Sequence, residues 1–240
     1  MKSLVFATAL ATCAAGAATA EEWTTQITPY AWAAGMGGTL TPYRGAPSLS
    51  FDKSFSDVME DLDAAFFLSG SARRDRLVIL GDFSWSSSSR NGRLDSGIPA
   101  EGELTQRSVT LTAGYRAIQN DRMSLDVLAG MRAWKLKASV SVAGGAISAS
   151  HTETFVDPII AARARFDLSP RWSAVFYYDR GGFGVGSEST SQAVVTANYR
   201  VNDRLGIAAG YRRLDVDYRS GGTRMDVTMS GPVVSLSWRF

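Results

Sequence analysis

The last sixteen residues of the chain, 225–240, alternate in character with a period of two. The large apolar side chains at the end of this segment fall on one side: Pro232, Val234, Leu236, Trp238 and Phe240. The residues between them are mostly small or polar. A period of two predicts a β-strand, because successive side chains of a strand point to opposite faces. This strand has one apolar, aromatic face and ends the chain on a phenylalanine.

The rest of the chain repeats this alternation, with two kinds of connection between the segments. Four short polar turns of the Asn, Asp or Pro type each end on an arginine: 73–76, 119–122, 168–171 and 201–204. Longer connections rich in Gly and Ser lie near 42–62, 90–102, 143–156, 186–189 and 219–223. Short turns at one rim and long loops at the other are typical of bacterial outer-membrane barrels, with the short turns in the periplasm.

Counting strands between these connections predicts ten, at 23–41, 63–73, 76–89, 103–118, 122–142, 148–168, 171–185, 189–201, 204–218 and 224–240. An even number places both ends on the periplasmic side, as a closed antiparallel barrel requires. A spanning strand needs about 9–11 residues, so several of these segments should project beyond the membrane. The alternative of eight strands leaves too much of the chain in loops. We therefore expect an all-β, closed, antiparallel transmembrane barrel of ten strands.

The two faces can be assigned for most strands. The predicted outward residues are Val109, Leu111, Ala113 and Tyr115, then Trp172, Ala174, Phe176 and Tyr178, and then Ala193, Val195, Ala197 and Tyr199. The predicted inward residues are Ser108, Thr110, Thr112, Arg116, Ser173, Asp179, Gln192, Thr196, Asn198 and Arg200. In two strands the apolar residues change phase after the matching runs 129–132 and 209–212. We interpret each change as a β-bulge, which would turn the following side chains to the other face.

The first twenty residues have the features of a secretory signal peptide. Lys2 precedes an apolar run at 4–18, and Ala18 and Ala20 form a small-x-small cleavage site. We exclude a lipoprotein signal at Cys13, because the apolar region before it is too short. No apolar run of roughly 18 residues follows, so no membrane helix is expected. The expected organisation is a signal peptide at 1–20 and one barrel domain at 21–240.

Several motifs then resemble a known group of proteins. They are TPYAW at 28–32, FSD at 55–57, Asp157-Pro158, FYYDRGGFGVGS at 176–187, GYR at 210–212, LDVDY at 214–218 and the aromatic final strand. Together they resemble a family of proteobacterial outer-membrane β-barrel proteins, opacity-like or porin-like, of unassigned function. The resemblance implies a place in the Gram-negative cell envelope and no catalytic motif. The final strand also resembles the sorting signal of outer-membrane barrels, which implies the barrel assembly machinery as a partner.

The inward positions carry a set of charges that we expect to line the lumen: Arg73, Asp82, Arg116, Asp126, Arg132, Asp157, Arg163, Arg165, Asp179, Arg200, Arg212 and Arg239. A ten-stranded barrel is only slightly wider than the eight-stranded size that side chains fill. These charges predict a salt-bridged plug that stiffens the barrel. The alternative is a narrow path lined by arginine, which would favour anions.

The outward aromatic residues predict girdles at the two membrane interfaces: Trp134, Trp172, Tyr178, Tyr199, Tyr218, Trp238 and Phe240. Outer-membrane lipid and lipopolysaccharide are the partners such a surface implies. With a formal net charge of +2 there is no basic surplus for nucleic acid. The oligomeric state is left open.

The function expected from these features is structural, or that of a narrow passive pore. One His and one Cys provide no cluster for a metal, and no cofactor is expected. An enzyme that modifies lipids is an alternative centred on His151, which has Glu153 beside it as an orienting carboxylate. Surface adhesion through the loops at 42–62 and 143–156 is a further alternative. Residues 55–62 space their apolar side chains as a short helix does, which predicts a helical turn in the first long loop.

Overall fold

The computed structural model describes residues 22–41, 44–45, 47–93 and 98–240. The predicted signal peptide and its cleavage residues Ala18 and Ala20 lie outside this part of the chain. The described residues form twelve strands and one helix: β1 Thr24–Trp32, β2 Gly35–Thr41, β3 Leu49–Lys53, α1 Phe55–Asp61, β4 Leu62–Arg74, β5 Leu77–Arg93, β6 Pro99–Gln119, β7 Met123–Val142, β8 Ile147–Asp167, β9 Trp172–Gly182, β10 Ser189–Arg200, β11 Leu205–Ser220 and β12 Thr223–Arg239.

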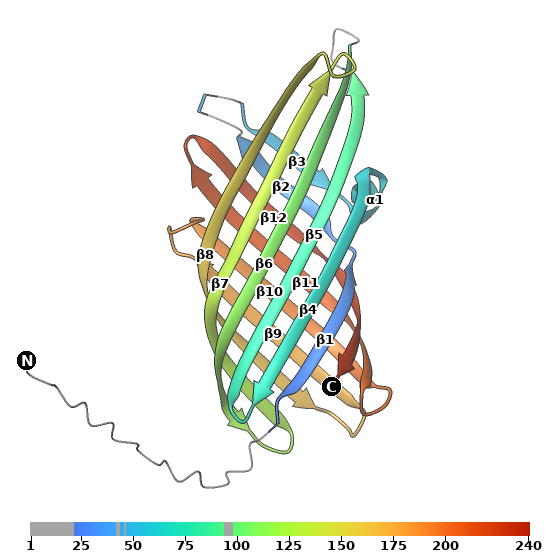
Figure 1. Cartoon of the computed structure of the whole chain (residues 1–240), viewed down its shortest axis with the longest axis vertical. Helices are drawn as coiled ribbons and strands as arrows, with labels where there is room; N and C mark the ends of the chain where they lie inside the picture. The colour runs from blue at the N-terminus through green and yellow to red at the C-terminus, as the bar shows by residue number, and fades with distance from the viewer. Residues whose placement is uncertain (1–21, 42–43, 46, 94–97) are drawn as a thin grey trace, which may run out of the picture.

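Ten of the strands close into one antiparallel barrel (Figure 1). Strands β4 to β12 follow one another in sequence order around the ring, and β1 pairs with both β4 and β12. The prediction of a closed ten-stranded antiparallel barrel is confirmed. The predicted first strand, 23–41, is divided into β1 and β2, and both parts pair with β12. Strand β3 adds a hairpin to β2 inside the predicted first long loop.

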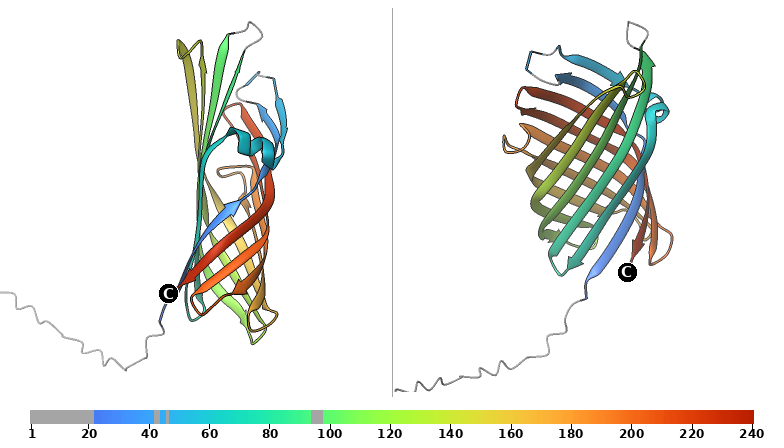
Figure 2. Two further views of the ribbon diagram at one scale, coloured as in Figure 1. Left: turned by 90° about the vertical axis from the view of Figure 1, so that its right-hand side faces the viewer. Right: turned by 45° about the horizontal axis from the view of Figure 1, so that its top comes forward.

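The strands extend further at one end of the barrel than at the other. One end carries the four short turns, and the last strand finishes there (Figure 1); we call it the short-turn end. At the opposite end, the long-loop end, β5, β6, β7 and β8 rise well above the other strands (Figure 2). Pairing between β6 and β7 continues to Ala100 and Val142, whereas β9 ends at Gly182. Several strands thus project beyond the rest of the barrel, and their projection beyond a membrane stays a prediction.

The predicted faces of β6, β9 and β10 are confirmed by which side chains are exposed. Val109, Leu111 and Tyr115 of β6 are about half exposed on the outer wall, whereas Ser108 and Thr112 are buried inside. In β9 and β10 the buried residues include Ser173, Asp179 and Gln192. The barrel therefore has an apolar outer surface around a polar interior over these strands.

The predicted bulges in β7 and β11 are wrong. Pairing of β7 with β8 runs without a shift from Met123 to Val142, and β11 pairs with β12 without a shift along its whole length. The inward face therefore continues in phase through Arg132 into Trp134 in β7. What changes is the chemistry of each face: towards the long-loop end the interior becomes apolar and the outer wall becomes charged. Beyond the apolar belt the outward side chains are polar. The pattern along the strand therefore changes although each residue keeps its inward or outward orientation.

Helix α1 lies at the rim of the long-loop end, where it contacts β2, β3 and β5 (Figure 2). The predicted helical turn is confirmed, with Ser54 as the N-cap. The Ser54 hydroxyl accepts from the Asp57 N–H, and the Asp57 carboxylate accepts from the Ser54 N–H, which forms a capping box. Lys53 and Arg90 reach Asp61 at 2.5 and 3.6 Å. Among the described residues, no helix has the length and apolar character needed to span a membrane.

Candidate functional site in the barrel interior

Apolar side chains fill the interior at the long-loop end. This apolar plug consists of Trp134, Phe155, Leu214, Val216, Tyr218, Val227 and Met229, all buried. The Phe155 ring stacks on Tyr218 with 4.3 Å between centroids, and Trp134 stacks on Phe155 at 6.0 Å. The prediction that Trp134 and Tyr218 belong to an outer aromatic girdle is therefore wrong. Both lie inside the barrel, because their strands keep their phase where the assumed bulges would have reversed it.

Below the plug, Arg132 forms the first of two buried clusters that make up a polar layer. Its guanidinium donates to Asp179 at 2.5 Å, to the Thr110 hydroxyl at 3.0 Å and to the Thr190 hydroxyl at 3.2 Å. These residues come from β6, β7, β9 and β10, so the cluster ties opposite parts of the wall together. Arg132 and Asp179 are 1% and 0% exposed. Burial of two charges is tolerated here because they pair and because two hydroxyls accept further guanidinium protons.

Arg212 forms the second cluster of the polar layer. Its guanidinium donates to Asp82 at 3.2 Å and to the Gln192 side-chain oxygen at 2.7 Å, and it also donates to the Tyr30 hydroxyl. The Tyr30 hydroxyl in turn donates to Asp82 at 2.9 Å. The same guanidinium lies 4.6 Å from the centre of the Trp32 ring, a cation–π contact. The sequence did not predict Tyr30 as a lumen residue, because its alternation does not settle which residues of the first strand face inward.

A third charged cluster lies nearer the short-turn end. Asp126 accepts from Arg116 at 2.7 Å and from Arg163 at 2.8 Å, so one carboxylate serves two guanidinium groups. Asp157, also predicted to face the lumen, is buried but pairs with no arginine in the described part of the chain. Its carboxylate accepts the Ser187 backbone N–H at 2.6 Å and so holds the loop after β9.

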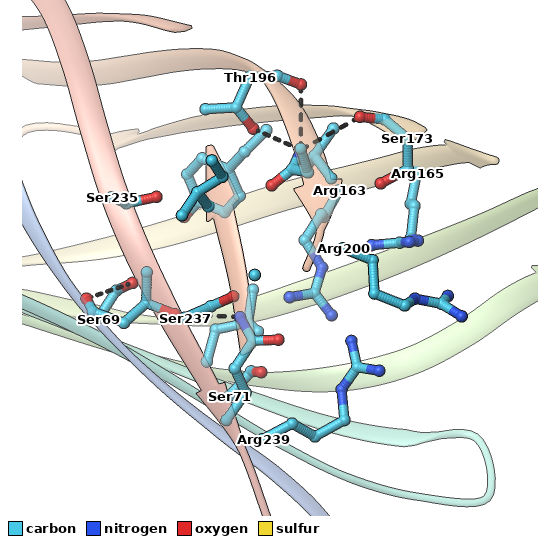
Figure 3. A pocket seen from close by; sticks show the side chains of 18 of the residues that line it. Ser69, Ser71, Arg163, Arg165, Ser173, Thr196, Arg200, Ser235, Ser237 and Arg239 are labelled. Atoms are coloured by element: carbon cyan, nitrogen blue, oxygen red, sulfur yellow. Dashed lines mark hydrogen bonds between the residues drawn. The ribbon is translucent and has the colours of Figure 1, made fainter. Parts of the chain in front are cut away.

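The remaining predicted arginines, Arg73, Arg165, Arg200 and Arg239, lie at the short-turn end. They line a cavity of about 550 Å³ that reaches up to Tyr30 and Asp82. Figure 3 shows the guanidinium groups of Arg163, Arg200 and Arg239 turned toward the same space. We call this cavity the arginine vestibule. The predicted lumen charges therefore do not form one network, since eight lie in or near buried clusters and four surround an open cavity.

The other predicted girdle residues lie on the outer wall. Trp172, Tyr178, Trp238 and Phe240 are exposed there, and Trp172 packs on Tyr199 with 5.0 Å between ring centroids. Large apolar side chains between them, such as Ile160, Val195, Ile207 and Leu236, are about half exposed. A continuous belt of exposed apolar and aromatic side chains is what a barrel surrounded by lipid presents.

His151 lies on the projecting part of β8. Its Nε2 atom is 2.8 Å from the Glu153 carboxylate, and Glu153 also accepts from the Tyr218 hydroxyl at 2.8 Å. The side chain of His151 is 67% exposed, and no hydroxyl among the described residues is hydrogen-bonded to it. In the same part of the chain, no three His, Cys, Asp or Glu residues are placed to hold a metal ion.

Comparison with known proteins identifies the architecture. No protein-family model matches the chain, and no curated protein matches it in sequence. Among solved structures, it is similar to the outer membrane protease OmpT from Escherichia coli, with a TM-score of 0.61 and 11% identity over 92% of this chain and 97% of that one. The fold is that of an outer-membrane β-barrel.

Two further outer-membrane barrels resemble the chain more weakly. The translocator domain of autotransporter NalP from Neisseria meningitidis has a TM-score of 0.49 and 15% identity over 91% of this chain and 89% of that one. The attachment invasion locus protein Ail of Yersinia pestis has a TM-score of 0.42 and 14% identity over 92% of this chain and 99% of that one. At such identities the likeness concerns the fold alone. The family resemblance drawn from the sequence motifs stays a prediction.

Proposed function

We propose that the protein is an integral outer-membrane barrel with a structural role, and that its lumen is closed to solutes. The apolar belt on the outer wall supports the membrane location, and outer-membrane lipid and lipopolysaccharide are the partners it would contact. The aromatic strand β12 would engage the barrel assembly machinery. The short-turn end then faces the periplasm and the projecting strands face the outside.

The observation that carries the closed lumen is the pair of buried layers across it. Leu214 in the apolar plug is 1% exposed, as is Arg132 in the polar layer beneath it. A ten-stranded barrel is narrow enough for side chains from opposite walls to meet. Here they meet twice in succession, first through stacked rings and then through hydrogen-bonded charges. The charged side chains of the polar layer pair with one another, as Arg132 does with Asp179 and Arg212 with Asp82. This pairing favours a rigid plug over an anion path.

A planar-bilayer recording tests this proposal. Purified protein, shown to have inserted by flotation with liposomes, is expected to give no discrete conductance steps, because neither layer leaves room for hydrated ions. A bacterial general porin, reconstituted in the same way, serves as the positive control. Stepwise, anion-selective currents from the inserted protein would contradict the closed lumen and restore the pore hypothesis.

Surface binding is a second candidate function, favoured by the projecting wall of β5, β6, β7 and β8. These strands pair with one another far above the end of β9, which is more height than spanning a membrane needs. Shortening the tip at residues 143–150 tests it, because an adhesive role would be lost while the plug residue Phe155 and the barrel below it are left in place.

Catalysis is no part of the proposal. His151 has an orienting carboxylate in Glu153, but no nucleophile is hydrogen-bonded to it and its ring is largely in water. Loss of an envelope-lipid modification in a His151→Ala variant would contradict this view.

A further inference from the structure

We propose that the arginine vestibule binds a small periplasmic molecule that carries at least two phosphate or carboxylate groups. The binding site itself follows from the cavity and its charges, whereas its periplasmic orientation and its separation from a channel rest on the proposed function. The ligand would enter from the short-turn end and stop at the polar layer, so the vestibule is a receptor site and not the mouth of a channel.

The vestibule has the size and charge of an anion site. Its volume of about 550 Å³ falls within the roughly 300–1,000 Å³ of small-molecule pockets. Nine arginines line it against three aspartates. Deeper in the barrel each arginine has its carboxylate: Arg212 has Asp82, and Arg116 and Arg163 share Asp126. The imbalance is therefore concentrated at the open end.

At this open end Arg165 pairs with Asp167 at 2.8 Å, but three other arginines, Arg73, Arg200 and Arg239, have no paired carboxylate among the described residues. Among the described residues, Arg200 and Arg239 make no side-chain hydrogen bond or ion pair, and Arg73 donates only to the Asp75 carbonyl at 3.0 Å. Arg239 is half-buried, and the like charges of Arg165, Arg200 and Arg73 act on it against the weaker attraction of Asp203. Converging like charges in a partly enclosed space are unfavourable, and this repulsion is relieved when an anion enters.

The arrangement of donors indicates the class of anion. Arg73, Arg165, Arg200 and Arg239 come from β4, β8, β10 and β12, so they surround the space instead of forming a line. An arginine fork matches two oxygens of one phosphate or carboxylate. Ser71, Ser235 and Ser237 line the same cavity (Figure 3). Arginines on several sides fit a molecule with separate acidic groups better than a single small ion.

Calorimetric titration of the full-length protein in detergent at low ionic strength tests the site. The two probes are tripolyphosphate, which carries phosphate groups, and citrate, which carries carboxylate groups. We expect saturable 1:1 binding of at least one probe, weakened by added salt because the contacts are charged. The double variant Arg200→Gln with Arg239→Gln should bind at least tenfold more weakly.

A matched control removes the same charge elsewhere. Arg213 and Arg219 are exposed on the outer wall near the long-loop end, where they pair with Asp215 and Asp217. The variant Arg213→Gln with Arg219→Gln should bind like the parent protein. The single variant Arg200→Gln guards against misfolding caused by a change in the final strand, and it should show a smaller but measurable loss.

The outcomes separate the possibilities. Binding of tripolyphosphate alone identifies a phosphorylated ligand, and binding of citrate alone a polycarboxylate; either supports the site. Absence of binding by both probes, or an equal loss in both double variants, would overturn it. A conducting barrel would contradict the closed lumen without affecting this result, so the two proposals fail independently.

Discussion

Each arginine of the polar layer meets its carboxylate across the barrel. Arg132 of β7 pairs with Asp179 of β9, although its neighbour in the sheet register is Asp157. Likewise Arg212 of β11 reaches Asp82 of β5. Contacts of this kind link strands that are not adjacent, so they brace the wall from inside. The charges therefore stabilise the shape of the barrel as well as closing its lumen.

Replacing Arg132 by Met should strongly destabilise the barrel. The change leaves the buried Asp179 carboxylate without its partner, which costs about 3–5 kcal/mol. Adding Asp179→Leu should recover a large part of the loss, because an apolar pair needs no charge compensation. Urea unfolding in detergent, followed by tryptophan fluorescence, measures both.

An exposed ion pair provides the control for the Arg132 and Asp179 variants. Arg219→Met breaks the ion pair with Asp217 on the outer wall and should change stability by only about 0–1 kcal/mol, because water screens both charges. If Arg132→Met behaved like Arg219→Met, the polar layer would not brace the barrel.

At the scale of the strand, glycine permits close packing of the wall. A Cβ atom on Gly210 would lie 1.9 Å from the Val195 carbonyl oxygen, and one on Gly130 would lie 2.0 Å from that of Leu111. Both glycines belong to the repeated runs at 129–132 and 209–212. The repeat therefore marks positions where a neighbouring strand passes close to the backbone, and not bulges.

A Gly210→Ala substitution should destabilise the barrel by about 1–3 kcal/mol, because the neighbouring strand must move to admit the methyl group. Gly102→Ala in β6 is the matched control, since a Cβ atom there meets nothing within 4 Å. The same urea titration compares the two. Equal stability of both variants would show that the wall yields at Gly210.

At the scale of the whole molecule, closure leaves no free edge around the ring and surrounds a packed interior with an apolar belt. Such a barrel should resist dodecyl sulfate until it is heated. We therefore expect an unboiled sample to migrate differently from a boiled one on a gel, and its circular dichroism in detergent to be rich in β-structure. A water-soluble protein whose migration ignores heating would contradict a membrane barrel.

The alternation of residues alone determined the strands, their number and most of their faces. Period two depends only on local backbone geometry, so Ser108, Asp179 and Trp238 could be placed from their positions in the chain. The inward charges were predictable for the same reason. The sequence misled where apolar residues change face, as at Trp134, because the same pattern arises from a bulge or from the edge of the apolar belt.

Only the tertiary structure decided what the inward residues do. Closing the ring brings Arg212 to Tyr30 and Asp82, and Tyr218 to Phe155, which are far apart along the chain. It also leaves Arg200 and Arg239 facing an open cavity, where among the described residues neither is paired with a carboxylate. Pattern along a strand determines which side a residue faces. Ring closure and strand register determine what it meets there, because partners across the lumen lie on strands that are not sequence neighbours.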